Sequence, residues 1–264
     1  MKGSSAMLPK PEQIAQRLLA RTALARPPIN LDKVIAIWSN LSVVEEELDG
    51  SGYLLPLGKL GAEIVVNKSD APERRRFTIA HELGHWVLGL IWQKKSGEFQ
   101  QPPQIPRADI EKWCDSFATN LLMPSELVRP WVSEWRKPTL IDTLLRACQT
   151  FNVSEQAFFI RVWELSKVQV ATLKSRSEQH GGDFEVEQNF AGRENQERLS
   201  ELLQAPAVQT QIRLGSPIVF FSGTGRGSSF YCSGRRLPGN RVIMAIGWGE
   251  EGRCSSGSRT AGPS

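Results

Sequence analysis

The sequence predicts an α+β protein with more than one domain, and three observations lead to this fold class. Helical periods and strand-like runs alternate over residues 11–66. Mostly helical patterns then occupy residues 72–166. From about residue 168 onward, short strand-like runs dominate. We therefore place a domain boundary near residue 167.

The composition is that of an ordinary globular protein. The 264 residues allow one large domain or two smaller ones, and 40% hydrophobic with 23% charged residues is usual for globular chains. No run approaches the roughly 18 apolar residues of a membrane helix. The first residues lack the apolar core of a secretory signal. We therefore expect a cytoplasmic protein with no membrane segment.

Cysteine spacing and net charge limit the classes of partner. The four cysteines lie far apart and form no CxxC pair; they are Cys114, Cys148, Cys232 and Cys254. In a reducing compartment we expect them to be free thiols. The net charge is +4 and the pI is about 9.0, which allows weak attraction to an acidic partner but does not require nucleic acid.

The first elements are short and alternate in type. Two helical periods come first, at residues 11–23 and 31–38. Three strand-like pieces follow at residues 41–45, 52–55 and 63–66, with Gly, Asp and Ser between them.

A long helix is predicted at residues 72–90. Asp70 is a suitable N-cap, and Pro72 suits the first helical turn. A polar, Pro-rich loop at residues 94–107 comes next. The remaining helices are predicted at 108–122, closed by Pro124, and at 125–134, 139–150 and 155–166, the last with Ser154 as its cap. The final pair, with a four-residue turn, resembles a helix-turn-helix unit.

The last part of the chain is predicted to be rich in strands. VQVATLK, FEVE, PIVFF, SSFYC and RVIMAI have the composition of strands, and one helix is expected at about 194–204. The tail from Gly247 is rich in Gly and Ser and is expected to be disordered.

Two of the chain's three histidines lie in the predicted long helix, in the stretch FTIAHELGHWVLGL. His81 and His85 are four residues apart, so one helical face carries both imidazoles. Such a pair can bind one Zn²⁺, and Glu82 is then placed to act as a general base toward water. Zinc provides a water nucleophile at neutral pH and polarises a carbonyl. The alternative, two surface histidines, conflicts with the apolar flanks of the helix.

A catalytic zinc site needs a third protein ligand. The remaining histidine, His180, lies beyond the domain boundary in SEQHGGD, and we assign it to the surface. The next predicted helix offers Glu111, with Asp109 as its main competitor. Asp115 lies one turn after Glu111, where it would accept a hydrogen bond from the outer nitrogen of a ligand histidine.

At these residues the chain resembles the ImmA/IrrE family of metallopeptidases. The family pairs an RFTxAHEhGH-type helix with a second helix that ends in LLMP, and here the two segments are RRRFTIAHELGHWVLG and EKWCDSFATNLLMP. The resemblance implies a compact gluzincin-like fold, in which a small sheet packs on the HExxH helix.

The resemblance also implies roles for single residues. His81, His85 and Glu111 correspond to the metal ligands, and Glu82 to the catalytic acid/base. Asp115 stands where the family usually has Asn, and its extra charge is expected to tighten the metal and make its water less acidic. Zinc is the default metal for two histidines and a glutamate. Mn²⁺ can replace it, because affinity order alone does not decide the metal in a cell.

The resemblance extends toward the C-terminus and implies a function. The helix pair matches a helix-turn-helix-like segment of the IrrE-like radiation-response regulators, and FYCSGRRLPGNRVIMAI resembles part of their GAF-like domain. The implied domains are a metallopeptidase domain at 11–124, a helical segment at 125–167, a GAF-like sensor at 168–246 and a tail at 247–264. Family members cleave a helix-turn-helix transcriptional repressor, so a zinc endopeptidase that derepresses DNA-damage and stress-response genes is expected.

Two other functions stay open at this point, and both are regulators that act without proteolysis. The first binds DNA through the helix pair, but Phe158, Phe159 and Trp163 suit a packed helix rather than one that reads bases. The second senses a ligand with its C-terminal domain, where Arg235 and Arg236 form either an anion site or a solvated turn. Direct DNA binding is therefore not expected, and the oligomeric state stays open.

Overall fold

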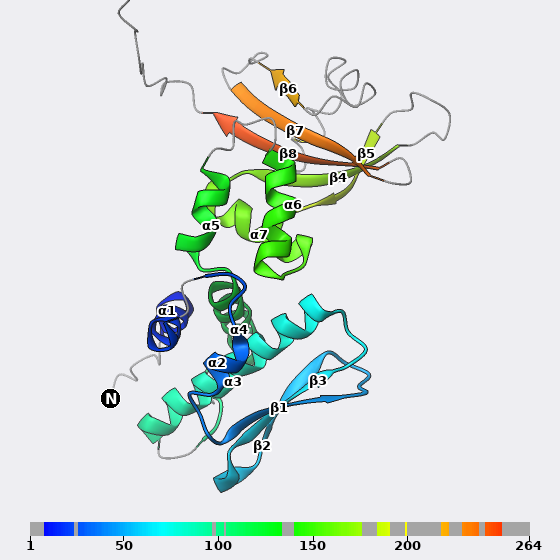
Figure 1. Cartoon of the computed structure of the whole chain (residues 1–264). Helices are drawn as coiled ribbons and strands as arrows, with labels where there is room; N and C mark the ends of the chain where they lie inside the picture. The colour runs from blue at the N-terminus through cyan, green and yellow to red at the C-terminus, as the bar shows by residue number, and fades with distance from the viewer. Residues whose placement is uncertain are drawn as a thin grey trace, which may run out of the picture. The chain divides into compact units, whose positions relative to one another are not determined.

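The structure is a computed structural model of the chain (Figure 1). It describes residues 8–23, 26–96, 99–102, 104–133, 140–175, 184–190, 199, 218–221, 229–237 and 241–249. These residues form two compact units. The first unit contains the described residues up to Ser133 together with Thr143–Leu165, and the second contains the others.

A three-stranded sheet lies in the first unit. Its strands are β1 (Leu41–Glu46), β2 (Gly52–Pro56) and β3 (Ala62–Asn67). β3 is the middle strand, parallel to β1 and antiparallel to β2. Strand β2 is therefore an edge strand, and one side of its backbone lies outside the ladder. All three strands are confirmed within one residue of the ends that the sequence predicts.

Seven α-helices occur within the described part of the chain, and each corresponds to a predicted helix. They are α1 (Pro11–Thr22), α2 (Leu31–Ile35), α3 (Pro72–Ser96), α4 (Arg107–Leu122), α5 (Ser125–Val132), α6 (Leu140–Phe151) and α7 (Glu155–Ser166). Helix α3 is six residues longer than predicted, because IWQKKS contains no helix breaker. Helix α2 is shorter, since the residues after it form tighter turns with bonds such as Trp38 N–H to the Ile35 carbonyl.

Helix α3 packs against the sheet through β2 and β3 and against α4 (Figure 1). Gly84 permits the close approach of α3 and α4, because a Cβ at this position would lie 3.2 Å from the Cα of Cys114. Ala80, Leu83 and Leu88 of α3 are buried. The two helices that carry the predicted metal ligands are therefore held side by side by core packing.

The N-cap residue of α3 differs from the predicted one, although the helix itself starts where it was expected. The helix begins at Pro72, as expected, so Asp70 lies two positions before it rather than at the N-cap. The Asp70 carboxylate pairs with Nε of Arg74 at 3.3 Å. The Arg75 N–H donates to the carbonyl of Ala71, which closes the first helical turn. The predicted capping role of Asp70 is therefore wrong, although its charge still lies near the positive end of the helix.

Helices α6 and α7 are joined by three residues, and the second helix has the predicted cap. The N–H of Ala157 donates to Oγ of Ser154 at 3.2 Å. On α7, the side chains of Phe158, Phe159 and Val162 are fully buried. None of the described helices is both long enough and apolar enough to cross a membrane.

A five-stranded antiparallel sheet with the order β5-β4-β8-β7-β6 lies in the second unit. Its strands are β4 (Gln169–Ser175), β5 (Phe184–Asn189), β6 (Ile218–Phe221), β7 (Ser229–Leu237) and β8 (Arg241–Gly249). The expected helix near 194–204 lies outside the described residues except for Leu199, as does the tail after Gly249. Residues 247–249, predicted to start the tail, instead pair with β7 as the end of β8.

Candidate metal centre

Two imidazoles from α3 face each other across one helical turn. The Nε2 atoms of His81 and His85 lie 3.2 Å apart. The side chains are 16% and 14% exposed, so both rings are mostly removed from water. Neighbouring i and i+4 positions on a helix produce this pairing directly.

Glu111 from α4 brings a carboxylate to the same point. Its Oε2 atom lies 3.2 Å from Nε2 of His81 and 3.4 Å from Nε2 of His85. Tetrahedral ligands bound at about 2.0–2.1 Å lie about 3.3–3.4 Å from one another. The three atoms therefore have the mutual spacing of three ligands around one tetrahedral ion.

Asp115, one turn after Glu111, fixes the orientation of His81. Its Oδ1 atom lies 2.8 Å from Nδ1 of His81. A carboxylate only accepts hydrogen bonds, so Nδ1 carries a proton, and metal binding would use the lone pair of Nε2. That lone pair points toward the carboxylate of Glu111, an arrangement that a cation between the two atoms would stabilise. The donor set of His81, His85 and Glu111 thus fits a metal ion.

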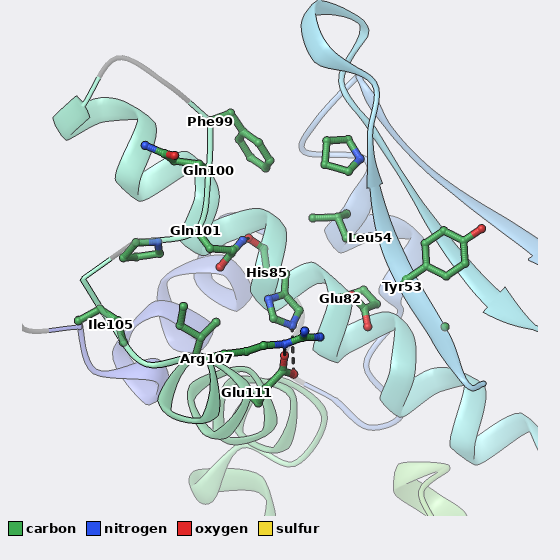
Figure 2. Close-up of a pocket in the computed structure, with 14 residues that line it drawn as sticks. Tyr53, Leu54, Glu82, His85, Phe99, Gln100, Gln101, Ile105, Arg107 and Glu111 are labelled. Atoms are coloured by element: carbon green, nitrogen blue, oxygen red, sulfur yellow. Dashed lines mark hydrogen bonds and ion pairs between the residues drawn. The ribbon is translucent and has the colours of Figure 1, made fainter. Parts of the chain in front are cut away.

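Glu82 lies next to this group of atoms but is not one of its donors. The residue is 8% exposed, and burial raises the pKa of its carboxyl, while His85, His81 and the backbone N–H of Leu54 partly oppose the rise. The Leu54 N–H donates to this carboxyl from edge strand β2. Figure 2 shows Glu82, His85 and Glu111 around one pocket.

Arg107 contacts the second carboxylate oxygen of Glu111 from the solvent side. Nε of Arg107 donates to Oε1 of Glu111 at 3.3 Å. Burial alone would raise the pKa of Glu111, but His85, the bond from Arg107 and His81 together lower it. The carboxylate is therefore kept ionised, as a metal ligand must be.

Cys114 is a neighbour of the site that the sequence did not indicate. Its Sγ and the donor nitrogens of His81 and His85 lie within 4.8 Å of one another. The thiol is fully buried, and burial raises its pKa. Oε2 of Glu111 lies 3.2 and 3.4 Å from the two imidazole nitrogens, and its carboxylate is ionised, whereas the Cys114 thiol keeps its proton, so Glu111 is the better candidate for a third ligand. The position of Cys114, three residues after Glu111 on α4, was the sequence feature that could have pointed to it.

The other candidates from the sequence do not reach the donor atoms. The carboxylate of Asp109 lies 3.8 Å from Nζ of Lys112, on the exposed side of α4. His180 lies outside the described residues. The structure thus brings together His81, Glu82, His85, Glu111 and Asp115, and leaves Asp109 apart.

A pocket of about 630 Å³ opens beside Glu82, His85 and Glu111. It is also lined by β2 and by residues of the segment between α3 and α4, including Phe99 and Gln101. Nε2 of Gln101 donates to the backbone carbonyl of His85 at 2.9 Å. The sequence pattern indicates only a polar loop here and assigns no role to either residue, although a Phe within a polar stretch is unusual.

A small mixed sheet, a helix with the pattern His-Glu-x-x-His, and a glutamate from the following helix define the class of metallopeptidase-like domains. Residues 39–162 match the family model Peptidase_M78, described as the IrrE N-terminal-like domain. This match confirms the resemblance seen in the sequence for this segment.

Comparison with other proteins gave two further results. A solved structure described as a Mycobacterium tuberculosis transcriptional regulator has 14% sequence identity and a TM-score of 0.49, covering 90% of this chain and 75% of that chain. No curated protein matches this chain.

Proposed function

We propose that this chain is a zinc-dependent endopeptidase. The observation that carries the proposal is the spacing of the three donor atoms of His81, His85 and Glu111, at 3.2, 3.2 and 3.4 Å from one another. The match to the Peptidase_M78 family model over residues 39–162 adds to it. A buried glutamate directly beside the donors is the second part that peptide hydrolysis requires.

In this proposal each side chain has a separate task. His81, His85 and Glu111 hold the ion, and Asp115 keeps the His81 ring in the orientation that ligation needs. A zinc ion, when bound, supplies a Lewis acid that makes water a nucleophile at neutral pH and polarises the peptide carbonyl. Glu82 accepts a proton at its carboxylate and returns it to the leaving amine. The raised pKa of Glu82 makes its carboxylate a stronger base in the first of these steps.

We propose a helix-turn-helix transcriptional repressor as the substrate, so that cleavage derepresses DNA-damage and stress-response genes. This part rests on the family resemblance of the two motif helices and of the 139–166 helix pair. The five-stranded sheet of the second unit supports a separate C-terminal domain, to which we assign a GAF-like sensor role. Mn²⁺ is retained as an alternative metal.

The contacts of α7 argue against a regulator that reads DNA with this helix. Arg161, its main basic residue, is 6% exposed. Nη2 of Arg161 donates to Oδ1 of Asn120 at 2.7 Å, and Nε donates to the carbonyl of Met123 at 3.2 Å. A guanidinium used inside the protein is not free to contact base edges.

The direct test is incubation of the zinc-loaded full chain with the repressor encoded beside it, followed by mass spectrometry of the products. We expect one discrete cut. Glu82→Gln should bind zinc with unchanged affinity and leave the repressor intact, because only the proton-transfer group is removed. Cleavage by this variant at the native rate would refute the mechanism, and absence of any cut by the native chain would refute the choice of substrate.

A further inference from the structure

The pocket beside the candidate metal centre is bounded by two walls of apolar side chains. On one side, edge strand β2 contributes Leu54 and Pro56. On the other side lies what we call the apolar wall, formed by Phe99, Pro102, Ile105 and Ile110. Figure 2 shows Leu54 on the strand, with Phe99 and Ile105 on the other side of His85.

The ring of Phe99 is fixed in place by two residues of α3. A Cβ at Gly89 would lie 2.6 Å from the ring, so the ring rests directly on the helix backbone at this glycine. The Trp86 ring packs on Phe99 with 4.9 Å between the ring centroids. Any side chain larger than hydrogen at position 89 would displace Phe99. The Phe99 part of the apolar wall therefore rests directly on α3.

The rest of the apolar wall is held by hydrogen bonds. Nε2 of Gln101 donates to the carbonyl of His85 at 2.9 Å, which ties the segment to a metal-ligand residue. The N–H of Ile105 donates to the carbonyl of Pro102 at 3.1 Å and closes a turn. The wall is thus preformed, and little ordering is needed when a ligand binds.

The charged groups in the described lining already have partners in the site. Glu82 and Glu111 belong to the candidate catalytic centre, and Arg107 donates to Oε1 of Glu111 at 3.3 Å. Apart from the outer nitrogens of Arg107, whose side chain is 92% exposed on the solvent side, no further acid or base among the described lining residues is left for a charged substrate side chain. An apolar pocket with a few convergent polar groups is the usual form of a ligand site.

We infer that this pocket is an apolar specificity subsite. It takes a leucine- or phenylalanine-sized side chain next to the bond that is cut, seated between Leu54 and the apolar wall. The inference rests on the proposed peptidase function and adds the chemical class of substrate that the site selects. We place the subsite next to the candidate metal centre, because Glu82, His85 and Glu111 line the same pocket.

The test uses the zinc-loaded full chain and the α-hydroxamates of glycine, leucine, phenylalanine and lysine, with binding measured by isothermal titration calorimetry. The hydroxamate anchors each probe at the metal, and the side chain alone differs. Leucine and phenylalanine hydroxamates should bind about ten- to hundredfold more tightly than the glycine compound, because their side chains are buried. Equal affinity for all four would overturn the subsite while leaving the peptidase proposal intact.

Two variants and a matched control sharpen the result. Ile105→Asp places a carboxylate in the apolar wall, so it should remove the leucine preference and favour lysine hydroxamate. Leu60→Asp adds the same charge at a residue that is 80% exposed and outside the pocket lining, and it should change nothing. Phe99→Ala, which adds no charge, should lower leucine and phenylalanine binding at least fivefold but not glycine binding.

The possible failures are distinguishable. A leucine preference that persists in both Ile105→Asp and Phe99→Ala would overturn the subsite. If none of the hydroxamates bound more tightly to the zinc-loaded chain than to the metal-free chain, the metal centre would be refuted, and this inference with it.

Discussion

Oδ1 of Asp115 and Nδ1 of His81 lie 2.8 Å apart, and this bond joins the two helices at the candidate metal centre. It determines which nitrogen of His81 presents a lone pair toward Glu111 and His85. The relationship also accounts for an Asp at a position where the family usually has Asn, since both side chains offer an oxygen that accepts from Nδ1.

Substitution of Asp115 should weaken metal binding in two distinct degrees. Asp115→Ala removes the acceptor, and we expect a 10- to 100-fold loss of zinc affinity, the range found for such outer partners. Asp115→Asn retains an acceptor oxygen and should lose less than about tenfold. Competition with a chromophoric chelator measures both affinities. Equal losses for the two variants would show that the negative charge, and not the hydrogen bond, is the important property.

Glu111 and Asp109 offer a matched pair of substitutions on the first turns of α4. Glu111→Gln should reduce the rise in melting temperature that zinc produces, because a ligand that binds only the folded state stabilises it in proportion to its affinity. Asp109→Asn should leave the zinc-induced shift unchanged, since Asp109 lies beside Lys112 and away from the histidines. If instead Asp109→Asn reduced the zinc-induced shift and Glu111→Gln did not, the third ligand would be Asp109.

Local sequence patterns predicted the parts of the site that lie within single helices. The i, i+4 spacing alone places His81 beside His85, and the same spacing places Asp115 one turn from Glu111. That these two helices face each other required the family motif, because no local rule sets the packing of α3 on α4. Gly84 is the residue that makes this approach possible.

The pocket walls could not be predicted, because they depend on contacts between distant segments. The N–H of Leu54 reaches Glu82 only after β2 has paired at the edge of the sheet. Phe99 reaches Gly89 only after the Pro-rich segment has folded back on α3. Loops of this kind have no hydrophobic period, so their side chains cannot be assigned to a face from sequence.

Gly84→Ala should loosen the contact between α3 and α4. The added Cβ would lie 3.2 Å from Cα of Cys114 and from the ring of Phe117, neither of which can easily move. We expect a loss of about 1–3 kcal/mol in the free energy of unfolding, with weaker zinc binding because Glu111 moves away from the histidines. Gly50→Ala is the control, since nothing lies within 4 Å of a Cβ there. Urea denaturation and zinc titration of both variants provide the comparison; equal stability would contradict the packing argument.

Arg161→Lys should destabilise the first unit although it conserves the charge. The guanidinium donates hydrogen bonds to Oδ1 of Asn120 and to the carbonyl of Met123. A lysine ammonium cannot make both of these bonds at once. Buried acceptors left unpaired cost about 1–3 kcal/mol each. Arg146→Lys, at an exposed position of α6, should stay within about 0.5 kcal/mol of the native chain. Chemical denaturation tests this; similar losses for both variants would show that Arg161 is not a specific anchor.

Because of the Cys148 thiol, we expect the free energy of unfolding to fall as the pH rises above 9. Burial, with a smaller contribution from Glu155, raises the pKa of this thiol from 9.0 to about 12, and Sγ donates to the Leu144 carbonyl at 3.2 Å. Between these two values the unfolded chain loses the proton and the folded chain keeps it, so the folded state binds more protons and stability falls with increasing pH.

One such group contributes a slope of about 1.4 kcal/mol per pH unit. Cys148→Ala should therefore show a shallower decline between about pH 9.5 and 11 than the native chain, by roughly that slope. The measurement is the free energy of unfolding in urea at several pH values, with the values at pH 7 as the baseline for the lost packing. Parallel curves for the two proteins would mean that the folded state does not hold the Cys148 proton, and that water reaches the thiol in α6.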